Sequence, residues 1–197
     1  MWLALETATD RASVAVGESA EDAVEESLSG ARRHAGALLP MISSAMERRG
    51  VSLDDLSGVL VSDGPGSFTG LRVGAAVGKA LARARALPLW TAPSLMVRAA
   101  GVAGAGRLVL AVSDALRGDL YATAVRFDAG RVQVELEPGV WRPEALAGLE
   151  LAPDVLAGEA PPPAAAVLEQ WTGLRLIGPP EGAPRAVRLI GLAALEG

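Results

Sequence analysis

A helix expected over residues 67–85 constrains this chain most, because three glycines share one of its faces. Gly70, Gly74 and Gly78 lie four residues apart, which places them above one another on the helix surface. Each glycine costs about 1 kcal/mol relative to alanine in a helix interior. A smooth face of this kind lets another backbone approach closely, so we expect a close neighbour to offset the cost.

The other sides of this helix are also small or apolar. Most of the remaining positions are filled by Leu71, Val73, Ala76, Val77, Ala80 and Leu81. A helix that is apolar nearly all round is buried on more than one side. One side must meet the chain's own sheet. The other is covered either by a second layer of the same chain or by the surface of a partner, and the spacing leaves both alternatives open.

The turn before this helix follows a short apolar strand expected at residues 58–62. Its residues Gly64-Pro65-Gly66-Ser67 allow a tight reversal, and Ser67 is a favourable helix N-cap. A strand–loop–helix junction presents backbone N–H groups and is therefore a candidate anion site. It is not a Walker A loop, because residues 74–80 lack the fourth spacer and the Ser or Thr that would hold magnesium.

The rest of the chain reads as two similar halves. In the first half, alternation and helical spacing predict strands at 2–8, 12–17, 24–28 and after Pro88, and a helix over 36–49. In the second half they predict strands at 107–113, 119–127, 131–137, 155–156 and 174–177, and helices after Pro143, at 164–171 and at 184–195. Pro40 is expected only in the first turn of its helix or at a kink.

Each half is thus three antiparallel strands followed by an αβα unit. This order predicts an α/β fold of two ribonuclease H-like lobes with mixed sheets, the architecture of the actin and sugar-kinase superfamily. The flexible composition of residues 101–106 marks the boundary. We therefore expect an N-terminal lobe over residues 1–103 and a smaller C-terminal lobe over residues 104–197.

The composition excludes several kinds of chemistry. The 197 residues include no cysteine, which rules out disulfides, zinc thiolates and thiol catalysis. A single histidine, His34, argues against a histidine metal cage and a Ser-His-Asp triad. The net charge of −5 argues against autonomous binding of nucleic acid. Glu6 interrupts the apolar start and no apolar run reaches membrane length, so we expect a soluble, cytoplasmic protein.

Three segments together resemble the bacterial TsaB (YeaZ) family. They are Gly-Pro-Gly-Ser-Phe-Thr-Gly-Leu-Arg-Val-Gly at 64–74, Leu-Ala-Leu-Glu-Thr-Ala-Thr at 3–9, and the stretch from His34 through Pro40. The resemblance implies a non-catalytic subunit of the machinery that makes threonylcarbamoyladenosine in tRNA. It implies pairing with a TsaD-like catalytic subunit and a TsaE-like ATPase, contact with tRNA only through the complex, and a homodimer when the chain is isolated.

The resemblance also implies an interface built as a helical bundle from the helices at 36–49 and 67–85. The candidate interface residues are His34, Leu38, Leu39, Ile42, Met46, Phe68, Gly70, Leu71, Gly74, Ala75, Val77, Gly78 and Leu81. With such an interface, Gly74→Arg would break pairing and leave the fold largely intact. Catalytic relatives carry two metal-binding histidines on the first helix, whereas His34 stands alone here, so we expect no catalytic, cofactor or metal residue.

The alternative hypothesis is an enzyme, a small actin-superfamily kinase or ATPase that acts in the cleft between the lobes. It would need acidic ligands for magnesium and glycine-rich phosphate loops. Glu6, Asp10 and Asp114 are the plausible carboxylates, and the neighbouring turns lack the usual glycines.

Overall fold

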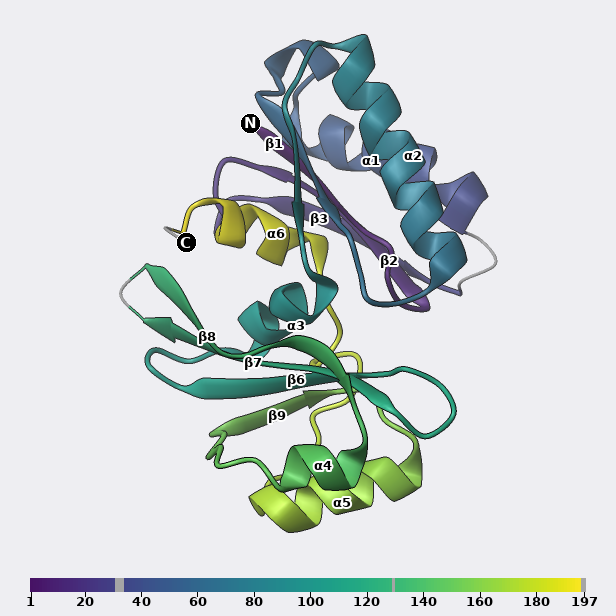
Figure 1. Cartoon of the computed structure of the whole chain (residues 1–197). Helices are drawn as coiled ribbons and strands as arrows, with labels where there is room; N and C mark the ends of the chain where they lie inside the picture. The colour runs from purple at the N-terminus through teal and green to yellow at the C-terminus, as the bar shows by residue number, and fades with distance from the viewer. Residues whose placement is uncertain (31–33, 129, 196–197) are drawn as a thin grey trace. The chain divides into compact units, whose positions relative to one another are not determined.

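The computed structural model describes residues 1–30, 34–128 and 130–195, and the chain divides into two compact units. Unit 1 consists of residues 1–97 together with 184–194, and unit 2 of residues 98–183 with the last residues of the chain. Each unit contains one mixed β-sheet with helices packed against it (Figure 1).

The sheet of unit 1 has five strands in the order β3-β2-β1-β4-β5. The strands are β1 (Trp2–Glu6), β2 (Arg11–Gly17), β3 (Val24–Ser29), β4 (Gly58–Ser62) and β5 (Leu89–Ala92). The first three strands are antiparallel, and β4 and β5 run parallel to β1. This is the strand arrangement that the sequence pattern predicted for the first half.

Helices cover both faces of this sheet. On one face lie α1 (His34–Arg49) and α2 (Phe68–Ala84), and on the other lies α6 (Ala186–Ala193) (Figure 1). Leu3 and Leu5 of β1 point into the core beneath α1 and α2, whereas Ala4 between them packs with α6. β1 is buried on both faces, because successive side chains of a strand point to opposite sides.

The sheet of unit 2 has four strands in the order β8-β7-β6-β9. They are β6 (Leu108–Asp114), β7 (Leu120–Asp128), β8 (Arg131–Trp141) and β9 (Val155–Gly158). Its core includes Leu146 of α4 (Pro143–Ala147) and Leu168 of α5 (Pro162–Thr172). The strand expected at 174–177 is reduced to a single bridge between Ile177 and Ala157.

Several local features differ from the expectation. The pattern missed α3 (Ser94–Val102) and the short 3-10 helix η2 (Leu53–Asp55), whose Ser52 and Asp55 form a capping box. Pro40 lies inside α1 without ending it. The C-terminal helix α6 groups with unit 1, although it belongs to the second half of the sequence. No helix in the described part of the chain is long and apolar enough to cross a membrane.

Candidate interface site

The glycine face of α2 packs against the chain's own sheet. A Cβ atom added at Gly70 would stand 2.0 Å from the carbonyl oxygen of Thr7, and one at Gly74 would stand 2.4 Å from Thr7 Oγ1. At Gly78 the nearest atom would be Val61 Cγ2, at 2.6 Å. These separations are far below van der Waals contact. The close neighbours that the glycine spacing required are therefore Thr7, just after β1, and β4. The interpretation of these three glycines as partner contacts is corrected.

The turn before α2 is held by the loop that follows β1. The Ser67 backbone N–H donates to the carbonyl oxygen of Ala8 at 2.6 Å, and a Cβ added at Gly66 would stand 2.2 Å from that same oxygen. Ser67 Oγ accepts a hydrogen bond from the Gly70 N–H, as its N-cap position predicted. The turn thus uses backbone donors within the chain and fixes where α2 begins.

Several candidate residues of α1 also face inward. Leu38, Ile42 and Met46 belong to the hydrophobic core beneath α1 and α2. Glu26 of β3 fixes the same helix from outside, since Glu26 Oε1 accepts hydrogen bonds from Ser44 Oγ at 3.0 Å and Arg48 Nη1 at 2.6 Å. The hydrogen bonds from Arg48 and Ser44 lower the pKa of the Glu26 carboxyl.

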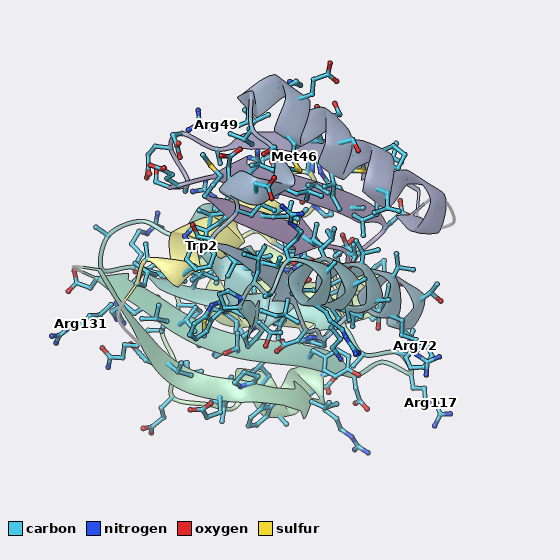
Figure 2. The ribbon with its side chains drawn as sticks, turned by 90° about the horizontal axis from the view of Figure 1, so that it is seen from above. Trp2, Met46, Arg49, Arg72, Arg117 and Arg131 are labelled. Atoms are coloured by element: carbon cyan, nitrogen blue, oxygen red, sulfur yellow. The ribbon has the colours of Figure 1, made fainter. Side chains whose placement is uncertain are left out.

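Two large apolar side chains of these helices lie in solvent. Leu39 of α1 is 56% exposed and Phe68 at the start of α2 is 68% exposed. The Arg72 guanidinium lies 3.8 Å from the centroid of the Phe68 ring, a cation–π contact that their i, i+4 spacing could have predicted. Figure 2 shows the Arg72 side chain projecting outward. α1 and α2 therefore present an outer surface that the chain itself does not cover.

The remaining candidates divide between partly covered and undescribed positions. Four side chains of α2 are half-buried: Leu71, Ala75, Val77 and Leu81. His34 is the first residue of α1, and its side chain lies outside the part that the structure describes. We define the outer surface of α1 and α2 as Leu39, Phe68 and these four half-buried residues.

The carboxylates of the enzyme hypothesis each accept a backbone hydrogen bond. Glu6 Oε1 accepts from the Ala8 N–H at 2.7 Å, Asp10 Oδ2 from the Gly30 N–H at 3.2 Å, and Asp114 Oδ1 from the Leu116 N–H at 2.7 Å. Within the described ranges, no three His, Cys, Asp or Glu side chains gather so that they could hold a metal ion. Glu6 and Asp114 thus hold their own turns, and Asp10 joins the turn after β1 to the residue after β3.

Comparison with known proteins assigns the family. The family model described as "TsaD: tRNA N6-adenosine threonylcarbamoyltransferase" matches residues 25–171. The "tRNA threonylcarbamoyladenosine biosynthesis protein TsaB" of Escherichia coli (strain K12) is 34% identical over 145 residues, which make up 72% of this chain and 58% of that protein. The match therefore spans little more than half the length of this relative.

Solved structures agree with this assignment. "YeaZ from Pseudomonas aeruginosa" superimposes with a TM-score of 0.79 at 29% identity, over 98% of this chain and 89% of that one. "ROK Hexokinase from Thermus thermophilus" superimposes with a TM-score of 0.50 at 13% identity, over 98% and 97%, which supports the fold alone. The expected actin and sugar-kinase architecture is confirmed. The protein belongs to the family whose model is described as TsaD, and within it to the TsaB (YeaZ) family.

Proposed function

We propose that this protein is a non-catalytic scaffold and activator subunit of the complex that makes threonylcarbamoyladenosine in tRNA. It pairs with a TsaD-like catalytic subunit and a TsaE-like ATPase, and it reaches tRNA only through the complex. It works in the cytoplasm, and the isolated chain forms a homodimer. In this proposal the N-terminal lobe, expected over residues 1–103, carries the interface helices, and the smaller lobe over 104–197 does not.

The observation that carries the proposal is the exposure of Leu39 and Phe68 on α1 and α2. Aromatic and aliphatic side chains of this size are the usual anchors of protein interfaces. Half-buried residues around them, such as Leu71 and Ala75, would supply the surrounding contact. The name of the Escherichia coli relative supplies the pathway, since that protein is named for threonylcarbamoyladenosine biosynthesis.

Burial of the glycine face changes the variant that tests the interface. Arg at position 74 would collide with Thr7 and damage the fold, so Gly74→Arg does not isolate pairing. Phe68→Asp is preferable, because Phe68 is exposed and a carboxylate near a helix N-terminus is favourable. We expect Phe68→Asp to weaken binding to a TsaD-like subunit at least about tenfold, the cost of losing an interface anchor.

Leu116→Asp is the matched control. Leu116 is 70% exposed, and its positive φ of 69° is one that Asp adopts readily. Binding measured by titration calorimetry should be unchanged by this substitution. Equal affinities for both variants would refute the assignment of the interface.

The function itself is tested by reconstitution. Combining the protein with a TsaD-like enzyme, a TsaE-like ATPase, tRNA and the threonylcarbamoyl donor should yield modified tRNA, measured by mass spectrometry of digested nucleosides. Omission of this protein alone should abolish the product. Undiminished modification without it would disprove the scaffold role.

A further inference from the structure

A groove runs between α2 and the outer strand of the first sheet, β5. Its volume is about 290 Å³. Leu71 and Ala75 of α2 and Leu89 of β5 contribute apolar wall, and Arg72 and Lys79 line the helix side. The groove lies entirely within unit 1. Phe68, Leu71 and Ala75 line the groove and also belong to the outer surface of α1 and α2, so the two surfaces overlap along α2.

The backbone of β5 has an open edge along this groove. β5 is the last strand of the sheet on this side, and its described partner is β4. The carbonyl oxygens of Pro88 and Ala92 accept hydrogen bonds from β4 and the residue after it. Because alternate residues of a strand bond to the same neighbour, the N–H and C=O groups of Leu89 and Thr91 point away from β4, toward the open edge.

Apolar side chains lie on both sides of this edge. Leu89 and Thr91 line the groove beneath α2. Trp90 is 58% exposed, and it belongs to the opposite face of the strand because side chains alternate. A strand added to β5 would place alternate side chains in the groove and over Trp90. One occupant in an extended conformation would therefore satisfy the backbone edge and cover apolar surface on both faces.

The charges favour an acidic occupant. Among the residues that the structure describes, neither Arg72 nor Lys79 forms an ion pair. Asp63 lines the groove just beyond the end of β4, whereas Lys79 adjoins Gly78, whose face meets Leu89. Acidic side chains are therefore expected nearer the Leu89 end. A second copy of this chain would bring another Arg72 and Lys79 to the same groove, and like charges would oppose that pairing.

We propose that the open edge of β5 and the groove beside α2 bind an extended segment of another protein, in which apolar residues alternate with acidic ones. Main-chain hydrogen bonds to Leu89 and Thr91 would give affinity. Side chains entering the groove would give specificity, as in other cases of strand addition. The proposal does not depend on the function proposed above.

The test uses a fluorescently labelled Glu-Val-Glu-Val-Glu-Val peptide as probe, with the full-length protein and a Lys-Val-Lys-Val-Lys-Val peptide for comparison. Fluorescence anisotropy should show at least roughly tenfold tighter binding of the acidic peptide, falling with added salt. Hydrogen exchange followed by NMR should slow at the Leu89 and Thr91 amides when the peptide binds. The Trp90 and Ala92 amides already face β4 and should change little.

Lys79→Glu should weaken the acidic peptide roughly tenfold, whereas Arg83→Glu on the same helix, outside the groove, should not. Thr91→Pro removes an outward N–H and should abolish binding. If that variant does not fold, the hydrogen exchange at Leu89 and Thr91 and the effect of Lys79→Glu still test the proposal. Equal binding of both peptides, or binding without slower exchange at Leu89 and Thr91, would overturn the proposal. Exchange at these amides that becomes faster on dilution of the protein alone would identify a second copy as the occupant and also overturn it.

Discussion

At the scale of single residues, the absence of a side chain sets the position of α2. Gly74 faces Thr7, whose Oγ1 is buried and has no hydrogen-bond partner among the described atoms. Gly36 in α1 is exposed, and a Cβ added there would meet nothing within 4 Å. A methyl group would therefore clash at Gly74 but fit freely at Gly36, so replacement by alanine should have opposite effects on stability at the two positions.

We predict that Gly74→Ala destabilises the protein by about 2 kcal/mol, because the added methyl group overpacks the contact with Thr7. Gly36→Ala should instead stabilise it by up to about 1 kcal/mol, the difference in helix propensity. Urea denaturation followed by circular dichroism measures both changes. In a Gly74→Ala background, Thr7→Ala removes the hydroxyl in the way and should recover much of the loss. A Gly74→Ala protein as stable as the original would show that this contact is not tight.

The same residues show where prediction from the sequence ends. The four-residue spacing of Gly70, Gly74 and Gly78 predicted a close neighbour, and that prediction is confirmed. Spacing could not identify the neighbour, because the neighbour depends on the fold, which brings Thr7 and Val61 of β4 within 3 Å of where a Cβ atom would stand on these glycines. The exposure of Leu39 could not be read from the sequence either, since the adjacent Leu38 is fully buried.

At the scale of elements, polar contacts hold α1 against the edge of the sheet. Glu26 of β3 accepts hydrogen bonds from Ser44 and Arg48, which lie on one side of α1. Strong periodicity predicted α1, α2 and the strands beside them close to their observed bounds. η2 and α3 were missed. η2 is shorter than a helical period, and α3 has small and apolar residues on nearly every side, so neither has the alternation on which such predictions depend.

The Glu26 contact predicts a pH dependence of stability. Its pKa is lowered in the folded state from the usual 4.5, so the folded state favours the charged carboxylate. The stabilisation is fully present above the unfolded-state pKa and is lost as the pH falls below it through the lowered folded-state value. Arg48 is largely exposed, so we expect the contribution to be about 0.5 kcal/mol.

Glu26→Gln should remove this part of the pH dependence, measured as the difference in unfolding free energy between neutral and acidic pH. Glu47→Gln provides the control, since Glu47 is exposed on the same helix. If Glu26→Gln and the original protein lose stability in parallel on acidification, the contact does not contribute as described.

At the scale of the whole molecule, the chain returns to its first unit at the end. α6 packs on the sheet formed by residues 2–92, with Val187, Leu189 and Ile190 in the core that contains Ala4 and Leu60. Ala186 N–H donates to Ser13 Oγ at 2.8 Å, which ties the start of α6 to β2. The repeat of strands and helices predicted both sheets, but it could not show that the last helix packs on the sheet of the first unit. Its contacts join residues more than a hundred positions apart, and no local pattern records them.

Because α6 packs on the sheet of unit 1, a substitution in α6 should destabilise unit 1. Ile190→Ala should cost about 3 kcal/mol, the loss of a buried aliphatic side chain and the cavity that remains. Unit 1 contains Trp2 and Trp90, and unit 2 contains Trp141 and Trp171, so each unit has its own fluorescent reporters. Replacing one pair with phenylalanine lets the unfolding of the other unit be followed alone in urea. Ile190→Ala should lower the midpoint reported by Trp2 and Trp90.

The matched control is Leu168→Ala, which removes a fully buried side chain from the core of unit 2. It should lower the midpoint reported by Trp141 and Trp171 and leave the midpoint of the other pair unchanged. Together, the two substitutions show whether a residue stabilises the unit in which it packs or the half of the sequence to which it belongs. If Ile190→Ala shifted the transition of Trp141 and Trp171 instead, α6 would belong with the second half of the chain, as the order of the sequence first indicated.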